Sequence, residues 1–437
     1  MSKAKRFGLV TVAAAVLFGC APFGARADAE TYAITNATVY TLGPAGKIEH
    51  GTVVVRDGRI SAVGAAVAVP PDASRIDGTG KIVTPGLFDP ISRFGIEEVS
   101  AVKETRDLSV EGSRFTASFD VTAAINPRSM LIPVNRIAGV TTAVVAPAVT
   151  EKGTILAGLG AVIHLGSTER YLLKTPAAMF AAFGERGAEL SGGSRAAAML
   201  YLREALQDAR DFRANRAAYD GARRRSYVLD RPDLLALDPV LRGEIPLVVS
   251  VDRASDILAA LALARDFNLK LVIAGGAEGL LAAGDLARAR VPVVLNPLQD
   301  LPSAFESLGS TLENAARLAK AGVLIAFETG DSHNARNLTQ LAGNAVAYGL
   351  PYEEGLKAIM LNPARIYGLD GRTGSLAPGK DADLVVWNGD PLEVTTAAEE
   401  VFIEGRKVPM VSRQTLLRDR YLGALRQGNL PPQYGKP

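Results

Sequence analysis

Cysteine is almost absent from this sequence, since Cys20 is the only one among 437 residues. A single thiol cannot form an internal disulfide, so the folded protein depends on a large hydrophobic core for its stability. Removal of the N-terminal segment would also leave no thiol nucleophile. Long apolar runs are missing as well, because none reaches the ~18 residues that a membrane-spanning helix needs. We therefore expect neither a transmembrane helix nor cysteine catalysis.

Two hydrolase motifs are also missing. The chain has no G-x-S-x-G stretch around a nucleophilic serine and no H-E-x-x-H stretch of a zinc protease. Histidine is scarce, with only His50, His164 and His333. What is present is a hydrophobic content of 48% with 22% charged residues, which is typical of a folded globular protein. The chain length indicates a large domain with a smaller one beside it.

The N-terminal segment has the pattern of an export signal. A basic start, MSKAKR, precedes the apolar run FGLVTVAAAVLF, and Ala25-Arg26-Ala27 offers a cleavage site. We predict a signal peptide over 1–27 and a periplasmic protein. The stretch LFGC, ending at Cys20, leaves open a lipoprotein anchored through that cysteine. The net charge of +2 comes mostly from this segment, so nothing in the balance points to nucleic acid as a partner.

Two β-rich segments lie near opposite ends of the chain. AITNATVYTL and GTVVVRDGRISAVG alternate apolar and polar residues and break at glycine and aspartate, which is a hairpin pattern. A matching pattern returns in ADLVVWNGD and EEVFIEGRKV, over 382–390 and 399–408. We predict one composite β-sandwich built from 28–84 and 375–412, followed by a C-terminal tail over 413–437.

The middle of the chain, 85–374, alternates buried strands with amphipathic helices. PLVVSV, KLVIAG, VPVVLN and VLIAF are continuous apolar strands, and each precedes a helical pattern. Such spacing indicates parallel strands with right-handed crossovers. The length fits an α/β (β/α)8 barrel of the TIM type. A doubly wound open sheet is the alternative, although no glycine-rich phosphate fingerprint follows the first strand.

Four stretches resemble signatures of the amidohydrolase superfamily, in its imidazolonepropionase-like and dipeptidase-like branch. They are GKIVTPGLFDP (80–90), GVTTAVVAP (139–147), LNPARIYGL (361–369) and GSLAPGKDADLVVW (374–387). The resemblance covers nearly the whole chain after the leader. It implies a metal-dependent barrel hydrolase with a composite β-sandwich, acting on C–N bonds of amides, lactams or small peptides. In that family, histidines, an aspartate and often a carboxylated lysine hold the metal, which activates a water molecule.

The metal-binding positions implied by the resemblance are degenerate. The paired histidines of the first strand align with Ile91 and Arg93, and the lysine with His164. The histidines of strands five and six align with Ser250 and with Gly275 or Gly276, and the last aspartate with Asp331, where Gly330 leaves the register uncertain. Three histidines cannot fill four positions, so we expect no metal cofactor. One divalent ion, such as zinc, on His164, Asp331 and His333 is the alternative.

The remaining polar residues of these strand ends are the candidate site. Arg93 would supply positive charge at the barrel mouth, held by Asp331 and Asp252, and would bind a carboxylate or phosphate. Ser250, Asp252 and His333 would complete the substrate-binding residues, and Asp331 would be the catalytic residue. Plainer interpretations stay open. Arg93 could be a surface cation, Asp331 a helix cap, His164 a buried hydrogen-bonded residue, and Glu97 with Glu98 solvated loop charges.

Three functions remain compatible with the sequence. The first is a binder of a small anionic or peptide-like ligand that has lost hydrolysis. The second is a hydrolase of C–N bonds in amides, lactams or dipeptides, working through an altered mononuclear or metal-free site. The third is a structural or partner-binding role in the cell envelope, and a homo-oligomer is compatible with all three. The identity of the ligand depends on barrel loops whose shape the sequence does not predict.

Overall fold

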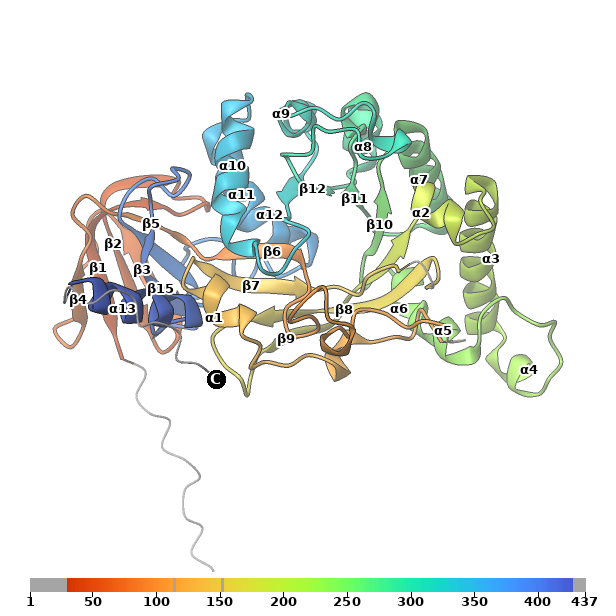
Figure 1. Cartoon of the computed structure of the whole chain (residues 1–437), viewed down its shortest axis with the longest axis horizontal. Helices are drawn as coiled ribbons and strands as arrows, with labels where there is room; N and C mark the ends of the chain where they lie inside the picture. Colours follow the sequence, from red (N-terminus) through yellow and green to blue (C-terminus); the bar gives the residue numbers. More distant parts are fainter. Residues whose placement is uncertain (1–29, 113–114, 151–152, 427–437) are drawn as a thin grey trace, which may run out of the picture.

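The computed structural model describes residues 30–112, 115–150 and 153–426. The predicted signal peptide and Cys20 lie outside these residues, as does the end of the predicted tail. The described chain forms two parts, a composite sheet and a barrel (Figure 1). The composite sheet lies at one end of the long axis, and the helices that follow the first half of the barrel lie at the other.

The composite sheet takes strands from both ends of the chain. Its hydrogen-bonded order is β16-β15-β14-β5-β1-β2-β3, and β4 pairs with β1. The strands are β1 (Tyr32–Tyr40), β2 (Lys47–Arg56), β3 (Arg59–Gly64), β4 (Ser74–Asp77), β5 (Ile82–Pro85), β14 (Leu384–Trp387), β15 (Ala398–Ile403) and β16 (Arg406–Lys407).

The two chain ends meet where β5 pairs antiparallel with β14. The indole Nε1 of Trp387 donates a hydrogen bond to Thr84 Oγ1 at 2.8 Å across this junction. Side chains from both ends, among them Ile34, Val83 and Phe402, form one buried core. The predicted composite domain is therefore confirmed. Its strands belong to a single sheet that curves around that core, so the two layers of the predicted sandwich are continuous.

The second sheet forms the barrel. Its order is β13-β12-β11-β10-β9-β8-β7-β6, which follows the chain in reverse. The strands are β6 (Leu87–Ser92), β7 (Val140–Val145), β8 (Leu156–His164), β9 (Leu172–Ala182), β10 (Leu247–Val251), β11 (Leu271–Gly275), β12 (Val293–Leu295) and β13 (Ile325–Phe327).

The predicted barrel is confirmed, with one strand reversed. Strand β8 runs antiparallel to both β7 and β9, whereas the other neighbours are parallel. The connections between β7, β8 and β9 are too short in sequence for a helical crossover that returns the chain to the same end, so β8 runs in the reverse direction. Between β13 and β6 the barrel is completed by other contacts: Asn362 Nδ2 donates to the Ile325 carbonyl at 2.8 Å, and Phe88 N donates to the Ile359 carbonyl at 2.9 Å.

Helices cover the outside of the barrel and lie between its strands. The α-helices are α1 (Leu131–Arg136), α2 (Gly184–Glu189), α3 (Arg195–Ala214), α4 (Arg216–Asp220), α5 (Arg231–Ala236), α6 (Asp238–Leu241), α7 (Ala254–Phe267), α8 (Ala283–Ala289), α9 (Asn314–Lys320), α10 (Leu338–Ala347), α11 (Tyr352–Ala358), α12 (Leu361–Ile366) and α13 (Arg413–Arg426). Short 3-10 helices are η1 (Lys103–Thr105), η2 (Val121–Ala123), η3 (Gly279–Ala282), η4 (Phe305–Ser307) and η5 (Ala335–Asn337).

The helices bear on the predicted C-terminal tail and on the expectation that the chain has no membrane-spanning helix. The segment assigned as a C-terminal tail begins with α13, which contacts α1. Within the described residues, no helix combines the length and apolarity needed to cross a bilayer.

Candidate ligand site at the barrel mouth

The carboxyl ends of the parallel strands define the mouth of the barrel. Val248 of β10 and Ala326 of β13 belong to the core cluster inside the barrel. Because side chains alternate along a strand, Ser250 and Glu328, two residues further on, face the same interior. Asp252 follows on this side of β10. Ser250 is exposed, so its hydroxyl is available at the mouth.

Glu328 is a strongly perturbed titratable group of the mouth. Burial raises its pKa from 4.5 to about 7, although the side chain keeps some contact with solvent. A backbone hydrogen bond from Gly330 and the charge of Arg93 oppose this shift, and Asp252 adds to it. A carboxyl with a pKa near neutrality can both accept and donate a proton, which is the property of a general acid–base.

Asp89 of β6 is a second carboxyl that resists ionisation. It is completely buried, and burial together with the nearby Glu328 raises its pKa well above the usual value. Its Oδ1 accepts a hydrogen bond from Ile91 N at 3.2 Å. Its Oδ2 is buried and makes no hydrogen bond within the described part of the chain. The carboxyl is therefore best described as the neutral acid, whose hydroxyl is available as a donor.

Asp252 is placed by an unusual backbone at the end of β11. Its Oδ1 accepts a hydrogen bond from Ala277 N at 3.0 Å, and burial raises its pKa. Gly275 has φ of +91°, and a Cβ there would stand 2.6 Å from Asp252 Oδ1. No side chain fits at this position while Asp252 keeps its hydrogen bond. Gly275 is one of the two positions where the family implies the strand-six histidine, so the structure explains why a histidine is excluded there.

Asp331 and His333 lie together in the loop after β13, and Asp331 is exposed. Asp331 Oδ1 accepts from His333 N at 2.8 Å, and Oδ2 accepts from Asn334 Nδ2 at 2.9 Å. Both oxygens thus hold the turn before η5, whose N-cap residue is Asn334, so Asp331 stabilises the turn and does not cap the helix. The His333 ring contacts Arg336, at 3.3 Å from His333 Nε2 to Nη2, and the Arg336 guanidinium also reaches Gln414 of α13.

His164 lies away from this loop. It ends β8 opposite Thr142 of β7, and its side chain is buried. Nδ1 accepts from Gly166 N at 3.2 Å, so Nε2 carries the proton that it donates to the Arg170 carbonyl. Both ring nitrogens are used in hydrogen bonds. The structure therefore does not bring His164 together with Asp331 and His333.

Arg93 directly follows β6, and its expected partners need correction. The guanidinium Nη1 lies 3.4 Å from Glu97 Oε2, an (i, i+4) pair, and Arg106 Nε lies 3.7 Å from the same oxygen. Glu97, regarded above as a solvated charge, is only 6% exposed. The predicted contacts with Asp331 and Asp252 were wrong, because the loop after β6 folds back and supplies its own carboxylate. The Arg93 backbone N–H donates to Ser332 Oγ at 2.6 Å, which ties this loop to the β13 side.

A cavity of about 690 Å³ opens beside Arg93. Among the residues that the structure describes, the cations Arg93, Lys103, Arg106 and Arg186 line it, against the single carboxylate of Glu111. The Lys103 ammonium makes no ion pair with any residue that the structure describes. An excess of fixed positive charge in a concave site attracts anions and suits carboxylates or phosphates.

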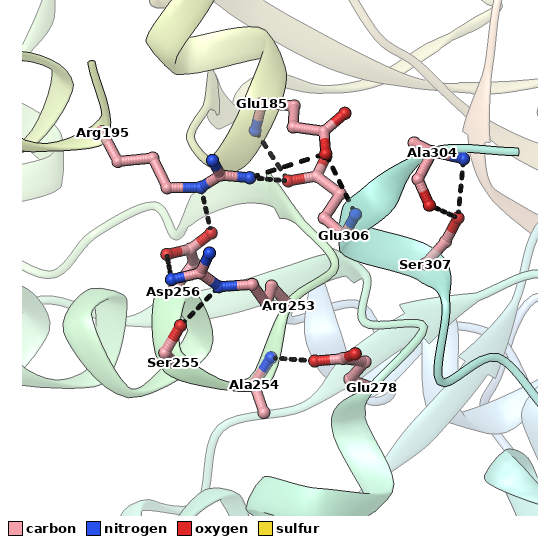
Figure 2. Close-up of polar contacts among 10 residues, drawn as sticks. All are labelled: Glu185, Arg195, Arg253, Ala254, Ser255, Asp256, Glu278, Ala304, Glu306 and Ser307. Atoms are coloured by element: carbon pink, nitrogen blue, oxygen red, sulfur yellow. Dashed lines mark hydrogen bonds and ion pairs between the residues drawn. The ribbon is translucent and has the colours of Figure 1, made fainter. Parts of the chain in front are cut away.

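A network of ion pairs fastens the loop between β12 and α9 to the neighbouring helices (Figure 2). Arg195 Nε lies 2.7 Å from Asp256 Oδ2, and its Nη2 lies 3.2 Å from Glu306 Oε2. Glu306 and Glu185 bind each other's backbone N–H groups, at 2.6 and 3.0 Å. A Cβ at Gly184 would stand 2.4 Å from Glu306 Oε2, so this close contact requires glycine. The network joins α2, α3, α7 and η4 into one rigid wall.

Several residues of the mouth were missed from the sequence. Glu328 and Asp89 were not selected, nor were Lys103, Arg106 and Arg186. Glu328 had a detectable signal, because it is the first residue after a strand and three residues before the chosen Asp331. The other cations lie on a long loop and on α2, where no local pattern marks their direction.

The donor set does not fit the metal centre that the family implies. A Cβ at Gly275 would collide with Asp252 as it is placed, and both His164 nitrogens make hydrogen bonds. Among the residues that the structure describes, no three His, Cys, Asp or Glu side chains are grouped to hold one ion. The metal content of the protein stays a prediction.

Comparisons with known proteins agree with this fold. The sequence model of the Amidohydrolase family matches residues 254–412. A solved amidohydrolase from Thermotoga maritima MSB8 is 31% identical, with a TM-score of 0.77 over 86% of this chain and 99% of that chain. Imidazolonepropionase of Brucella anthropi is 26% identical, covering 83% of this chain and 93% of that protein. The amidohydrolase tasK of Hapsidospora irregularis is 40% identical over 72 residues, only 7% of its length.

A barrel with a composite sheet from both chain ends and a polar mouth defines a hydrolase-type barrel protein. The chain belongs to the amidohydrolase superfamily, in its imidazolonepropionase-like branch.

Proposed function

We propose that the protein binds a small anionic ligand, carrying a carboxylate or phosphate, at the mouth of its barrel. The observation that carries this proposal is the cavity lined by Arg93, Lys103, Arg106 and Arg186. Ionised guanidinium groups bind carboxylates and phosphates through paired hydrogen bonds. Glu97 fixes Arg93 and Arg106 from behind, so their donors are oriented before the ligand arrives.

The buried carboxyls of the mouth are compatible with an anion. Burial raises the pKa of Asp89, Asp252 and Glu328, which favours their neutral forms. Neutral carboxyls do not repel an anion and can donate a hydrogen bond to a ligand oxygen. A peptide-like ligand would place its carboxylate against the cations and its amide against these donors.

A second candidate is hydrolysis of a C–N bond in an amide, lactam or dipeptide. The pKa of Glu328 near 7 favours it, because this carboxyl could take a proton from an attacking water and return it to the leaving nitrogen. The similar proteins named above include amidohydrolases and an imidazolonepropionase. Arg93 would then orient the substrate through its anionic group.

No cofactor is part of either proposal. We propose that neither binding nor any residual hydrolysis depends on a divalent ion, which is supported by the presence of Ile91, Arg93 and Ser250 at positions where the family implies histidines. The protein should purify, without chelator, with far less than one equivalent of zinc, manganese or iron. Two tightly held ions per chain, measured by mass spectrometry, would overturn this view of the site.

Binding and hydrolysis assays on the same purified protein can distinguish the two proposed functions. Calorimetric titration with inorganic phosphate, succinate and N-acetylated dipeptides would measure binding, and a panel of amides, lactams and dipeptides would measure hydrolysis. The binding proposal expects saturable 1:1 binding without turnover. Hydrolysis that falls by about 10²–10⁴ in Glu328→Gln but is unchanged in Asp331→Asn would establish the second candidate. No binding of any anion would reject the first.

We also propose that the protein is exported, supported by the basic and apolar pattern of its first residues. Fractionation of expressing cells, with Cys20→Ser as the matched variant, distinguishes the two forms of export. A soluble periplasmic protein is expected, unaffected by the substitution. Membrane association that Cys20→Ser abolishes would instead show lipid anchoring, and retention of full-length protein in the cytoplasm would reject export.

A further inference from the structure

A second cavity lies at the end of the barrel opposite the mouth. Its volume is about 160 Å³, well above the roughly 10–15 Å³ that one water molecule requires. It is bounded by α1, by the turn before α1, and by the β8–β9 connection. Since His164 at the end of β8 pairs with Thr142 near the start of β7, this cavity lies at the amino ends of the parallel strands.

Two arginines give this cavity its charge. Arg136 Nη1 donates to the Leu165 carbonyl at 3.0 Å, whereas its Nε is buried and has no hydrogen-bond partner in the described chain. The side chain of Arg128 is exposed at the rim, and it forms neither a hydrogen bond nor an ion pair with any described residue. No aspartate or glutamate is among the residues that line the cavity. The two positive charges therefore lack a counter-ion inside it.

The rest of the lining provides neutral polar groups. Ser167, Thr168 and Tyr171 bring hydroxyls from the β8–β9 connection. His164 closes the inner side in its Nε2–H form, as its two hydrogen bonds show. The nearest carboxylate to this histidine is Glu404 of the composite sheet, 3.8 Å from Nε2. Burial without a compensating anion lowers the pKa of Arg136, which shows that the protein alone leaves this guanidinium poorly solvated.

We propose that this cavity binds a small tetrahedral oxyanion, phosphate or sulfate, between Arg136 and Arg128. A bound oxyanion would accept hydrogen bonds from the free Nε–H of Arg136 and from the guanidinium of Arg128. The hydroxyls of Ser167, Thr168 and Tyr171 would donate to its remaining oxygens. The site is separate from the barrel mouth and does not depend on the function proposed there. Through His164 and Glu404 it borders the composite sheet, so occupancy would stabilise the contact between the two parts of the protein.

The test uses the full chain and inorganic phosphate, with sulfate as a second probe. The background variant Lys103→Gln/Arg106→Gln removes cations of the mouth, and titration calorimetry should still show one phosphate bound per chain. Adding Arg128→Gln, whose side chain makes no contact that the fold needs, should weaken this binding about tenfold. Arg136→Gln should weaken it further, and Arg136→Lys should restore part of it. Phosphate should also raise the melting temperature of the background variant but not of the variants at the second cavity.

Two outcomes would overturn the proposal. One is loss of all phosphate binding in the mouth variant, which would place every anion at the mouth. The other is unchanged affinity in Arg128→Gln and in Arg136→Gln, with both proteins folded as judged by circular dichroism. If phosphate binds at the second cavity while no anion binds at the mouth, this inference holds and the proposed function fails.

Discussion

The two sides of the barrel mouth differ in the charge of their side chains and in how far burial shifts their pKa values. Near β6 and η1, Arg93, Lys103 and Arg106 line the cavity, and the buried Glu97 pairs with the two arginines. On the side of β10 and β13, Asp252 and Glu328 are desolvated by burial, and their pKa values rise. The side near β6 therefore carries positive charge, whereas burial on the side of β10 and β13 disfavours the ionised form of the carboxyls.

Under the proposed function, this difference would let the mouth favour anions without a metal. In the family, a divalent ion supplies the positive charge at the mouth, and carboxylates face it in ionised form. Here the cations line the cavity beside Arg93, and burial raises the pKa values of Asp252 and Glu328, which favours their neutral forms.

Reversing the charge of the cationic side should have the largest effect. Lys103→Glu/Arg106→Glu places two carboxylates in the cavity and leaves Glu97 with Arg93 alone. We expect the affinity for an anionic ligand to fall at least about a hundredfold, since attraction becomes repulsion. Calorimetric titration measures this. Arg265→Glu, on the exposed face of α7, is the matched control and should bind as the wild type does. An equal loss of affinity in both variants would show that the cavity is not the site of anion binding.

Arg93→Ala tests a single cation. A charged hydrogen bond contributes about 1.5–3 kcal/mol, so ligand affinity should fall about ten- to a hundredfold. The fold should survive, because Glu97 keeps Arg106 as a partner and the buried Phe94 is untouched. Arg93→Lys should recover part of the affinity. Wild-type affinity in Arg93→Ala would show that this guanidinium only anchors its own loop.

The acidic side predicts a dependence of stability on pH. The unfolded Glu328 ionises near 4.5, and the folded one near 7. Its contribution to stability is therefore fully present below pH 4.5 and is lost as the pH rises through 7. Glu328→Gln should remove this component. The difference in free energy of unfolding between wild type and variant should change by about 1–3 kcal/mol across this window, the lower figure allowing for the group's contact with solvent.

Urea unfolding at several pH values measures that difference. The pKa values of Asp89 and Asp252 are also raised, so the free energy of unfolding of the wild type should fall more steeply with pH than Glu328 alone explains. Glu328→Gln keeps both aspartates and should retain that additional part of the loss. A wild-type protein whose stability rises steadily from pH 5 to 8, in parallel with Glu328→Gln, would contradict the neutral-carboxyl description.

The sequence was sufficient for the architecture because the relevant signals are periodic or local. Apolar strands followed by helices indicated the barrel, and matching β patterns at the two ends indicated the composite sheet. The reversal of β8 was not predictable in this way, since an apolar strand reads alike in both directions. Only the short connections on either side of it decide its direction.

The residues of the candidate site were harder to predict from the sequence, because their positions depend on register and on tertiary structure. Asp331 was chosen by its position in a motif, but Gly330 shifts the register and the structure places Glu328 inside the barrel instead. The pairing of Arg93 with Glu97 could have been inferred from their (i, i+4) spacing, which suits a turn that folds back. The roles of Lys103, Arg106 and Arg186 depend on where a long loop and α2 lie, which is a property of tertiary structure.

The smallest expected effect belongs to Asp331, and it separates the sequence-based role from the structural one. Both carboxylate oxygens accept hydrogen bonds within the exposed turn, from His333 N and Asn334 Nδ2. Asp331→Ala should lower the free energy of unfolding by about 0.5–1.5 kcal/mol, as expected for lost local hydrogen bonds, with ligand affinity within about twofold of wild type. Thermal unfolding and calorimetric titration of the same sample measure both. If instead affinity or hydrolysis collapses while stability is unchanged, Asp331 is the catalytic residue and the turn geometry is incidental.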